Sequence, residues 1–191
     1  SATHKTADSH DTLLLPNGAP VIQQAPRRAV CLSSQIAVLP PTLAGLKSLN
    51  RLDNVLASGE LEQIKTRSPD TGIGEGLLRD MSGQWVEGVM SNVFYQLSGS
   101  HTTSSGQQEG VNKDRNYLTD GQWYTPPMTR SGVAGVMRQV LIDSLAETQN
   151  PVIMRSLADN DLPKLSQMFF CNAVRGVMPV SSLTLLSGEV V

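Results

Sequence analysis

The sequence predicts a single domain of the mixed α+β class. Short β-prone runs, separated by glycine, proline and asparagine, outnumber two clear helical patterns that are interleaved with them. The chain has 191 residues, of which 39% are hydrophobic, so it can bury one compact core. No internal repeat divides it, and we therefore expect one folded unit.

The first part of the chain moves from a polar terminus to strands and then to a helix. Residues 1–11 are polar without an apolar period, which predicts an unstructured segment or linker ahead of a domain over residues 12–191. Three β-prone runs follow, separated by Asn-Gly and proline breaks. From residue 46 to residue 56 apolar side chains recur at helical spacing, which predicts a helix with Lys47 at its start.

The second part predicts further strands and one more helix. Residues 72–97 alternate in polarity around a Ser-Gly turn, which indicates a strand, a tight turn and two more strands. Residues 98–115 contain Ser, Gly and charged side chains without apolar anchors, so we expect an exposed, mobile loop. The Asp120-Gly121 pair predicts a hairpin, residues 131–148 form an amphipathic helix pattern opened by glycines, and residues 151–186 are β-rich.

Charge and cysteine content narrow the function classes. A net charge of -2 and a pI near 5.9 provide no basic face for a phosphate backbone, so we expect a small-molecule substrate and no nucleic acid. Cys31 and Cys171 match no metal-ligand or paired-thiol spacing, which favours buried, reduced thiols. No apolar run is long enough to span a membrane and no secretory signal opens the chain, so we expect a cytoplasmic protein without membrane contact.

Several common catalytic classes lack their residues. His4, His10 and His101 all fall in segments that we expect to be mobile, so a histidine triad or a zinc site has no rigid support. The sequence contains neither GxxxxGK[ST] nor GxGxxG after a strand, which excludes these two nucleotide-binding motifs. We expect no metal. A lysine, a glutamate and glycine-rich helix starts remain as carriers of chemistry.

Four segments bear a resemblance to a known family: AGLKSLNRLDNVL with Lys47, WVEGVMSNVF with Glu87, SGVAGVMRQV, and FFCNAVRGVMPV. In this order they resemble the fold-type IV pyridoxal-phosphate (PLP) enzymes, which include branched-chain and D-amino-acid transaminases and aminodeoxychorismate lyase. The resemblance implies the C-terminal domain of that fold, a sheet-rich pseudo-barrel with two main helices. The smaller N-terminal domain that the family places ahead of it has no counterpart in this chain.

The resemblance assigns roles to these residues. Lys47 holds PLP as a Schiff base, because a desolvated amine with a lowered pKa is neutral enough to attack the cofactor aldehyde. Glu87 faces the pyridine nitrogen and keeps it protonated, so that the ring accepts electrons from the substrate. A helix N-terminus and a tight turn offer N–H groups to the phosphate. These phosphate-binding residues are Gly135, Val136, Met137, Asn172 and Ala173.

Within the family, the segments NRL, GVMRQ and FCNAV are most similar to aminodeoxychorismate lyase. That branch converts 4-amino-4-deoxychorismate to 4-aminobenzoate and pyruvate in folate biosynthesis, and the family implies a homodimer. Two alternatives stay open, a D-amino-acid or branched-chain transaminase and a non-catalytic remnant of the fold. Because residues for the phosphate and the substrate pocket come from the N-terminal domain, we expect the isolated chain to bind cofactor weakly or to be inactive.

Overall fold

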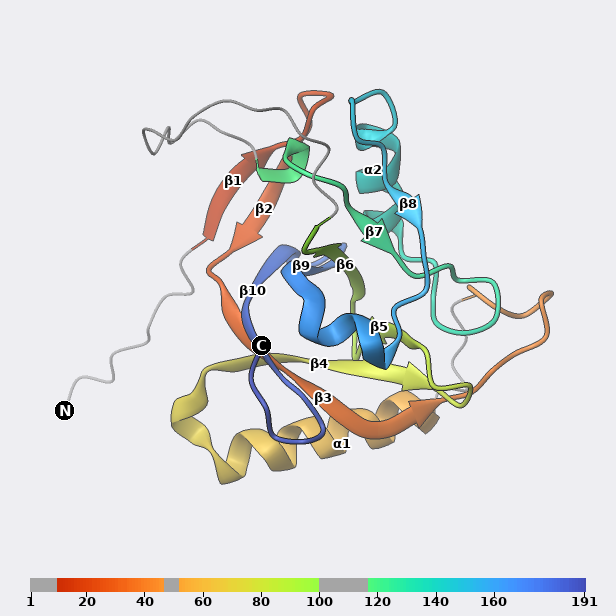
Figure 1. Ribbon diagram of the computed structural model, residues 1–191, viewed down its shortest axis with the longest axis vertical. Coiled ribbons are helices and arrows are strands. Elements are labelled where there is room, and N and C mark those ends of the chain that lie inside the picture. The colour runs from red at the N-terminus through yellow and green to blue at the C-terminus, as the bar shows by residue number, and fades with distance from the viewer. Residues whose placement is uncertain (1–9, 47–51, 100–116) are drawn as a thin grey trace.

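The structure is a computed structural model that describes residues 10–46, 52–99 and 117–191 (Figure 1). Within these ranges it contains two α-helices, three short 3-10 helices and ten strands joined in one sheet. In chain order they are β1 (His10–Leu14), β2 (Pro20–Gln24), β3 (Arg27–Ile36), α1 (Leu52–Arg67), η1 (Pro69–Thr71), β4 (Ile73–Asp80), β5 (Trp85–Gly88), β6 (Asn92–Leu97), η2 (Tyr117–Thr119), β7 (Tyr124–Thr125), α2 (Val136–Leu145), β8 (Ile153–Met154), η3 (Asp159–Lys164), β9 (Leu165–Asn172) and β10 (Gly176–Thr184).

Six of the strands close into a barrel. Around the ring, β10 pairs with β3 and β3 with β4 in parallel, and β4, β5, β6, β9 and β10 follow with antiparallel pairings. The β1–β2 hairpin attaches to β10, and β7 and β8 extend from β6. Closure leaves the barrel without an open edge. The predicted mixed class and the sheet-rich barrel with two main helices are confirmed.

The two faces of the barrel strands explain the alternation in the sequence. Leu77, Val93 and Phe170 belong to the core inside the barrel. Their neighbours along the strands face outward: Leu78 packs in the cluster under α1, and Phe94 and Phe169 pack with residues of α2. Successive strand residues point to opposite faces, so a strand covered on both sides has apolar residues in sequence. In Figure 1, α1 runs along β3 and β4 while α2 lies near β7 and β8.

The face that α1 packs against the barrel is not its apolar stripe. Leu52, Val55 and Leu56 are 67%, 64% and 62% exposed, whereas Ala57 and Leu61 are buried against the barrel. The helix therefore rests on the barrel through a narrow contact, and the leucine-rich stripe that the sequence displays faces away from it. No helix within the described ranges is long and apolar enough to cross a membrane.

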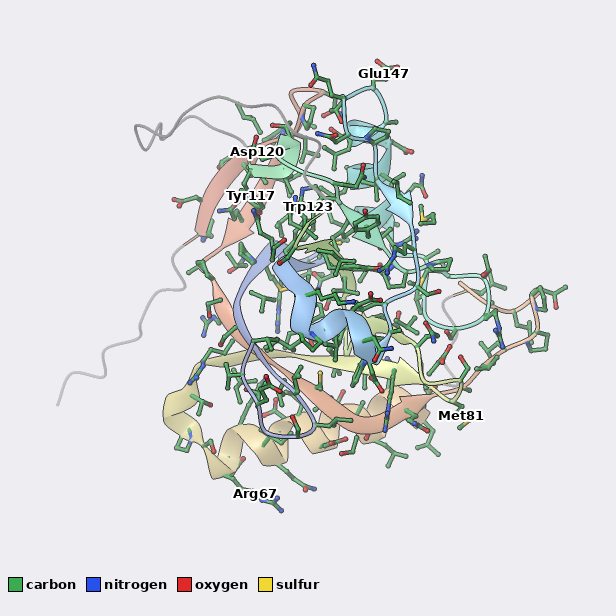
Figure 2. The ribbon with its side chains drawn as sticks, in the orientation of Figure 1. Arg67, Met81, Tyr117, Asp120, Trp123 and Glu147 are labelled. Carbon is green, nitrogen blue, oxygen red and sulfur yellow. The ribbon has the colours of Figure 1, made fainter. Side chains whose placement is uncertain are left out.

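Two expectations for the chain need correction. Strand β1 begins at His10, inside the segment expected to lack structure, because residues 10–14 pair with residues 20–24 of β2. The hairpin expected at Asp120-Gly121 is wrong. The turn exists, with Gly121 at a φ of 73°, but residues 117–119 before it form η2 and β7 after it pairs with β6 and β8 (Figure 2).

Some of the other expectations are confirmed, and others concern residues outside the described ranges. The expected strand, turn and two further strands are confirmed, and they span residues 73–97. The three early strands and the helix that follows Gly135 are also confirmed. Cys31 and Cys171 are buried free thiols, and burial raises the pKa of each to about 12. Lys47, His4, His101 and nearly all of the expected loop at 98–115 lie outside the described residues.

Candidate functional site

Glu87 is placed on the outer face of the barrel by an irregularity in strand pairing. The register between β4 and β5 shifts between Leu78 and Arg79, so that Glu87 pairs with Leu78, whose side chain packs outside the barrel. A bulge of this kind redirects a side chain from one face to the other. Glu87 is only 3% exposed, and its Oε2 accepts a hydrogen bond from the N–H of Val133 at 2.8 Å. The chain ahead of α2 thus fixes the orientation of this carboxylate.

Asn92 holds the same segment from the neighbouring strand. It pairs with Glu87 across β5 and β6 and is 4% exposed. Its Nδ2 donates to the carbonyl of Val133 at 2.7 Å, and its Oδ1 accepts from the N–H of Gly135 at 3.1 Å. Glu87 and Asn92 together make three hydrogen bonds to the backbone of residues 133–135. They therefore determine where α2 begins relative to the barrel.

The start of α2 offers backbone N–H donors. Gly135 is its N-cap in an extended conformation, and no side chain of the described residues caps the helix there. The first N–H groups of a helix have no partner within the helix, and they carry partial positive charge. Gly135 also lacks room for a side chain, since a Cβ would collide with Oδ1 of Asn92. Because Gly135 has no side chain, an anion can approach the backbone N–H groups of Val136 and Met137.

Asn172 is the last residue of β9, and Ala173 is the first residue of the turn to β10. Oδ1 of Asn172 accepts hydrogen bonds from the N–H groups of Val174 at 3.0 Å and Arg175 at 2.7 Å, and its Nδ2 donates to the carbonyl of Met90 at 3.2 Å. The side chain thus closes its own turn and ties it to the turn between β5 and β6. Ala173 is exposed at the tip. Contact between these two residues and a phosphate stays a prediction.

Lys47 lies outside the described residues, but the chain on both sides of it is placed. Gly45 bridges to Val133, and the N–H of Ala134 donates to the carbonyl of Gly45 at 2.9 Å. On the other side, Nδ2 of Asn54 in α1 donates to the carbonyl of Val89 at 3.1 Å. The segment before Lys47 therefore adjoins the residues that bind Glu87, and the helix after it is tied to the turn that follows Glu87.

Sequence reasoning missed two residues that support this site. Asn92 stood inside the WVEGVMSNVF motif, so its place in the motif was a signal that was not used. Glu75 had no such signal: it lies in β4, is 6% exposed, and accepts hydrogen bonds from the N–H of Val89 at 3.1 Å and from Oγ of Ser91 at 2.8 Å. Burial raises the pKa of Glu75 although these hydrogen bonds oppose the shift. It holds the turn between β5 and β6.

The described part of the site fits the cofactor that the sequence implies. PLP needs an anionic partner at its ring nitrogen and N–H donors at its phosphate. A buried, oriented carboxylate at Glu87 supplies the first, and the open N-terminus of α2 supplies the second. Gly132 has a φ of 77°, and a Cβ on it would lie 3.0 Å from Oε2 of Glu87. Glycine is therefore needed here, because Met128, Val86 and Glu87 leave no room for a side chain.

Comparison with known proteins gives relatives for both the sequence and the fold. The family model of amino-transferase class IV matches residues 4–183. Aminodeoxychorismate lyase of Vibrio harveyi is 26% identical over 146 residues, which are 76% of this chain and 43% of that protein. The crystal structure of 4-amino-4-deoxychorismate lyase from Pseudomonas aeruginosa has a TM-score of 0.62 and 32% identity, covering 83% of this chain and 47% of that chain.

A transaminase also shares the fold. The branched-chain amino acid aminotransferase from Thermobaculum terrenum, solved in its PLP form, has a TM-score of 0.59 and 21% identity, covering 83% of this chain and 43% of that chain. At this identity the likeness concerns the fold alone. In each of these comparisons, the chain spans less than half the length of its relative.

Proposed function

This chain belongs to the amino-transferase class IV family, whose members are PLP-dependent enzymes, and we propose that it is the cofactor-binding part of a 4-amino-4-deoxychorismate lyase. The observation that carries the proposal is the joint anchoring of residues 133–135 by Glu87 and Asn92, which sets a buried carboxylate beside an open helix N-terminus. The 32% identity with the Pseudomonas lyase favours the lyase branch, while the Vibrio lyase at 26% and a putative branched-chain aminotransferase of Methanocaldococcus jannaschii at 25% are nearly equal in identity.

Glu87 has the role of a fixed anion. PLP, when bound, supplies an electron-accepting ring to the reaction. Glu87 would hold the proton on the ring nitrogen, and the N–H of Val133 keeps the carboxylate from rotating. Because the side chain is 3% exposed, water competes little for its charge. The backbone N–H groups of Val136 and Met137 would bind the phosphate, and Asn172 and Ala173 would contribute further contacts to it.

Lys47 has two roles in the proposal. Its Nζ would hold the cofactor covalently until the substrate amine replaces it. The freed amine would then take a proton from the ring carbon of the substrate and return one to the enolpyruvyl group as that group leaves. Aromatisation of the substrate ring to 4-aminobenzoate makes the step favourable, and the second product is pyruvate. A homodimer in the cytoplasm belongs to the same proposal.

A transaminase is the second candidate, because a branched-chain aminotransferase shares the fold. The two reactions are separated by their products. The chain, loaded with PLP, is given 4-amino-4-deoxychorismate, and pyruvate is measured with lactate dehydrogenase. In a parallel reaction it receives a branched-chain or D-amino acid with 2-oxoglutarate, and glutamate is measured. Pyruvate release without glutamate formation supports the lyase, whereas glutamate formation without pyruvate contradicts it.

Variants link the turnover to the proposed lysine. Lys47→Ala should abolish pyruvate release, whereas Lys164→Ala changes an exposed lysine at the end of η3 and should leave it unchanged. If neither reaction occurs and the gene encodes residues ahead of Ser1, the same assays are repeated on that extended protein. Inactivity of the extended protein in both reactions would contradict the enzymatic proposal and favour a non-catalytic remnant.

A further inference from the structure

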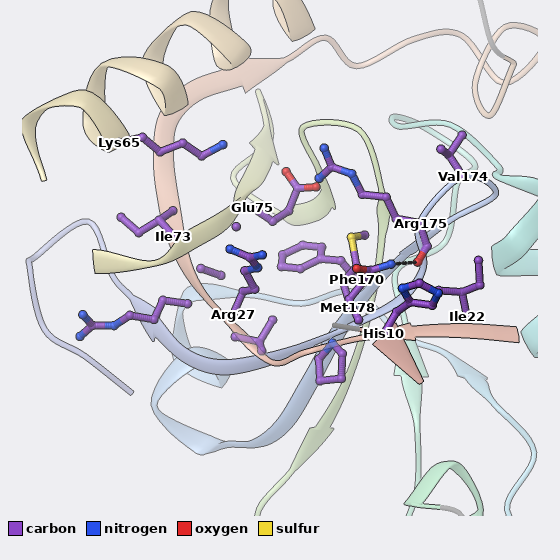
Figure 3. Close-up of a pocket in the computed structure, with 16 residues that line it drawn as sticks. His10, Ile22, Arg27, Lys65, Ile73, Glu75, Phe170, Val174, Arg175 and Met178 are labelled. Carbon is purple, nitrogen blue, oxygen red and sulfur yellow. Dashed lines mark hydrogen bonds between the residues drawn. The ribbon is translucent and has the colours of Figure 1, made fainter. Parts of the chain in front are cut away.

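A cavity of about 560 Å³ opens at the end of the barrel where β3 and β4 begin (Figure 3). Its walls come from the first residues of these two strands, from the turn after β9, and from Lys65 near the end of α1. None of the described residues assigned to the cofactor site lines it; those residues are Glu87, Gly135, Val136, Met137, Asn172 and Ala173. Its described lining therefore differs from the residues that the family resemblance assigns to the cofactor.

The lining of this cavity is cationic although the whole chain carries a net charge of -2. Four of the described lining residues are arginine or lysine: Arg27, Arg28, Lys65 and Arg175. Figure 3 shows Lys65, Arg27 and Arg175 reaching the hollow from three different parts of the fold. Lys65 also pairs with Glu62, but Glu62 is 70% exposed, and an exposed pair of this kind neutralises little of the local field.

One carboxylate occurs among the described lining residues, that of Glu75. Its two oxygens accept hydrogen bonds from the N–H of Val89 and the hydroxyl of Ser91, so the group is held by the turn between β5 and β6. Burial raises its pKa, while the charge of Arg175 acts in the opposite direction. Among the described lining residues, basic side chains therefore outnumber carboxylates.

The floor of the cavity is apolar. Phe170 and Met178 are 1% and 8% exposed, and both belong to the core inside the barrel. A volume in this range is typical of pockets for small molecules, which combine an apolar lining with a few polar or charged groups. Guanidinium groups match carboxylates in geometry and charge. The described lining therefore combines basic side chains with the edges of two mostly buried apolar side chains.

We propose that the barrel-mouth cavity binds a small organic anion, a carboxylate carried on an apolar ring, with Arg27 and Arg175 as its charged partners and Phe170 and Met178 beneath its ring. This is a second site that goes beyond the proposed lyase function and does not depend on it. The site adjoins the cofactor region through one turn, since the N–H of Arg175 donates to Oδ1 of Asn172.

The test uses benzoate as the probe, with the 191-residue chain in the absence of PLP and titration calorimetry as the readout. Benzyl alcohol supplies the ring without the charge, and inorganic phosphate supplies charge without the ring. We expect benzoate to bind at least about tenfold more tightly than either of them, which corresponds to one charge-assisted contact. Raising the salt concentration should weaken the binding of benzoate.

Variants locate the binding. Arg27→Gln and Arg175→Gln should each weaken benzoate binding about tenfold. Arg67→Gln removes an exposed arginine at the end of α1 that does not line the cavity, and it should have no effect. Glu87→Gln should also have no effect, because Glu87 lies at the other site. Circular dichroism of each variant checks that it is folded.

Three results would overturn the proposal. The first is the absence of benzoate binding up to about 20 mM, where even a weak site would begin to fill. The second is equal binding of benzoate and benzyl alcohol, or of benzoate and phosphate. The third is a loss of binding in Glu87→Gln together with normal binding in Arg27→Gln and Arg175→Gln, which would place the ligand at the cofactor site.

Discussion

Replacing Asn92 by alanine tests the anchoring of α2 most directly. The substitution removes the two hydrogen bonds of Asn92 to the backbone, one of 2.7 Å to the carbonyl of Val133 and one of 3.1 Å from the N–H of Gly135, and a weak contact of 3.9 Å to Sδ of Met128. A hydrogen bond between neutral groups contributes about 1 kcal/mol to stability, so the two together give about 2 kcal/mol. Val133 and Gly135 are only partly buried, and water reaching their backbone groups keeps the cost near this value.

The expected result is a lower melting temperature, measured by circular dichroism. For a chain of this size, about 2 kcal/mol corresponds to a decrease of about 4–8 °C. The matched control is Gln139→Ala, which removes a hydrogen bond from Gln139 to Asp143 on the exposed side of α2. A change within about 0.5 kcal/mol is expected there, because exposed side-chain contacts contribute little.

The same variant has a second consequence. Because the first turn of α2 is no longer held against the barrel, PLP affinity measured by fluorescence quenching should fall about tenfold, the effect of roughly 1.4 kcal/mol. Gln139→Ala should bind PLP normally. The anchoring role of Asn92 is refuted if Asn92→Ala has the same melting temperature as Gln139→Ala and binds PLP as tightly as the unmodified chain. Asn92 would then contribute neither to stability nor to the site.

Two other predictions concern the surroundings of the same carboxylate and the acid limit of stability. Gly132→Ala places a Cβ at a φ of 77° and 3.0 Å from Oε2 of Glu87, so we expect a loss of about 1–3 kcal/mol in urea unfolding together with weaker PLP binding; unchanged values of both would contradict it. For Asp80, burial alone would raise the pKa, but hydrogen bonds led by those from Ser82 and Ser131 lower it below the usual value of 3.8. This contribution to stability is present above pH 3.8 and is lost as the pH falls through the lower, folded-state pKa. The stability difference between the unmodified chain and Asp80→Asn should therefore shrink on acidification, and a difference that stays constant down to pH 3 would be the contrary result.

The strands of the barrel could be predicted because their residues obey a local rule. Phe169 and Phe170 face opposite sides of β9, and both sides are covered, so the run reads as apolar and β-prone. Lys47 and Glu87 could be proposed as a pair because they stand in motifs with fixed order. Neither inference required knowledge of which strands pair.

The remaining features depend on pairing between distant segments. The Asp120-Gly121 turn has the local sequence of a hairpin, but the strand after it pairs with β6 and β8, and Leu118 and Trp123 pack in the core with Phe169. Glu75 supports the turn after Glu87 only because β4 and β5 are neighbours in the sheet. No spacing within the sequence brings these residues together, so long-range contacts override the local signal.

We propose that Lys47 is the residue that holds PLP. The direct measurement is borohydride reduction of the chain after incubation with one equivalent of PLP, followed by proteolysis and mass spectrometry of the labelled peptides. We predict that the label lies on Lys47 and that Glu87→Gln diminishes it, because the ring loses its anionic partner. A label spread over Lys65 and Lys164, with Lys47 unmodified, would contradict the account.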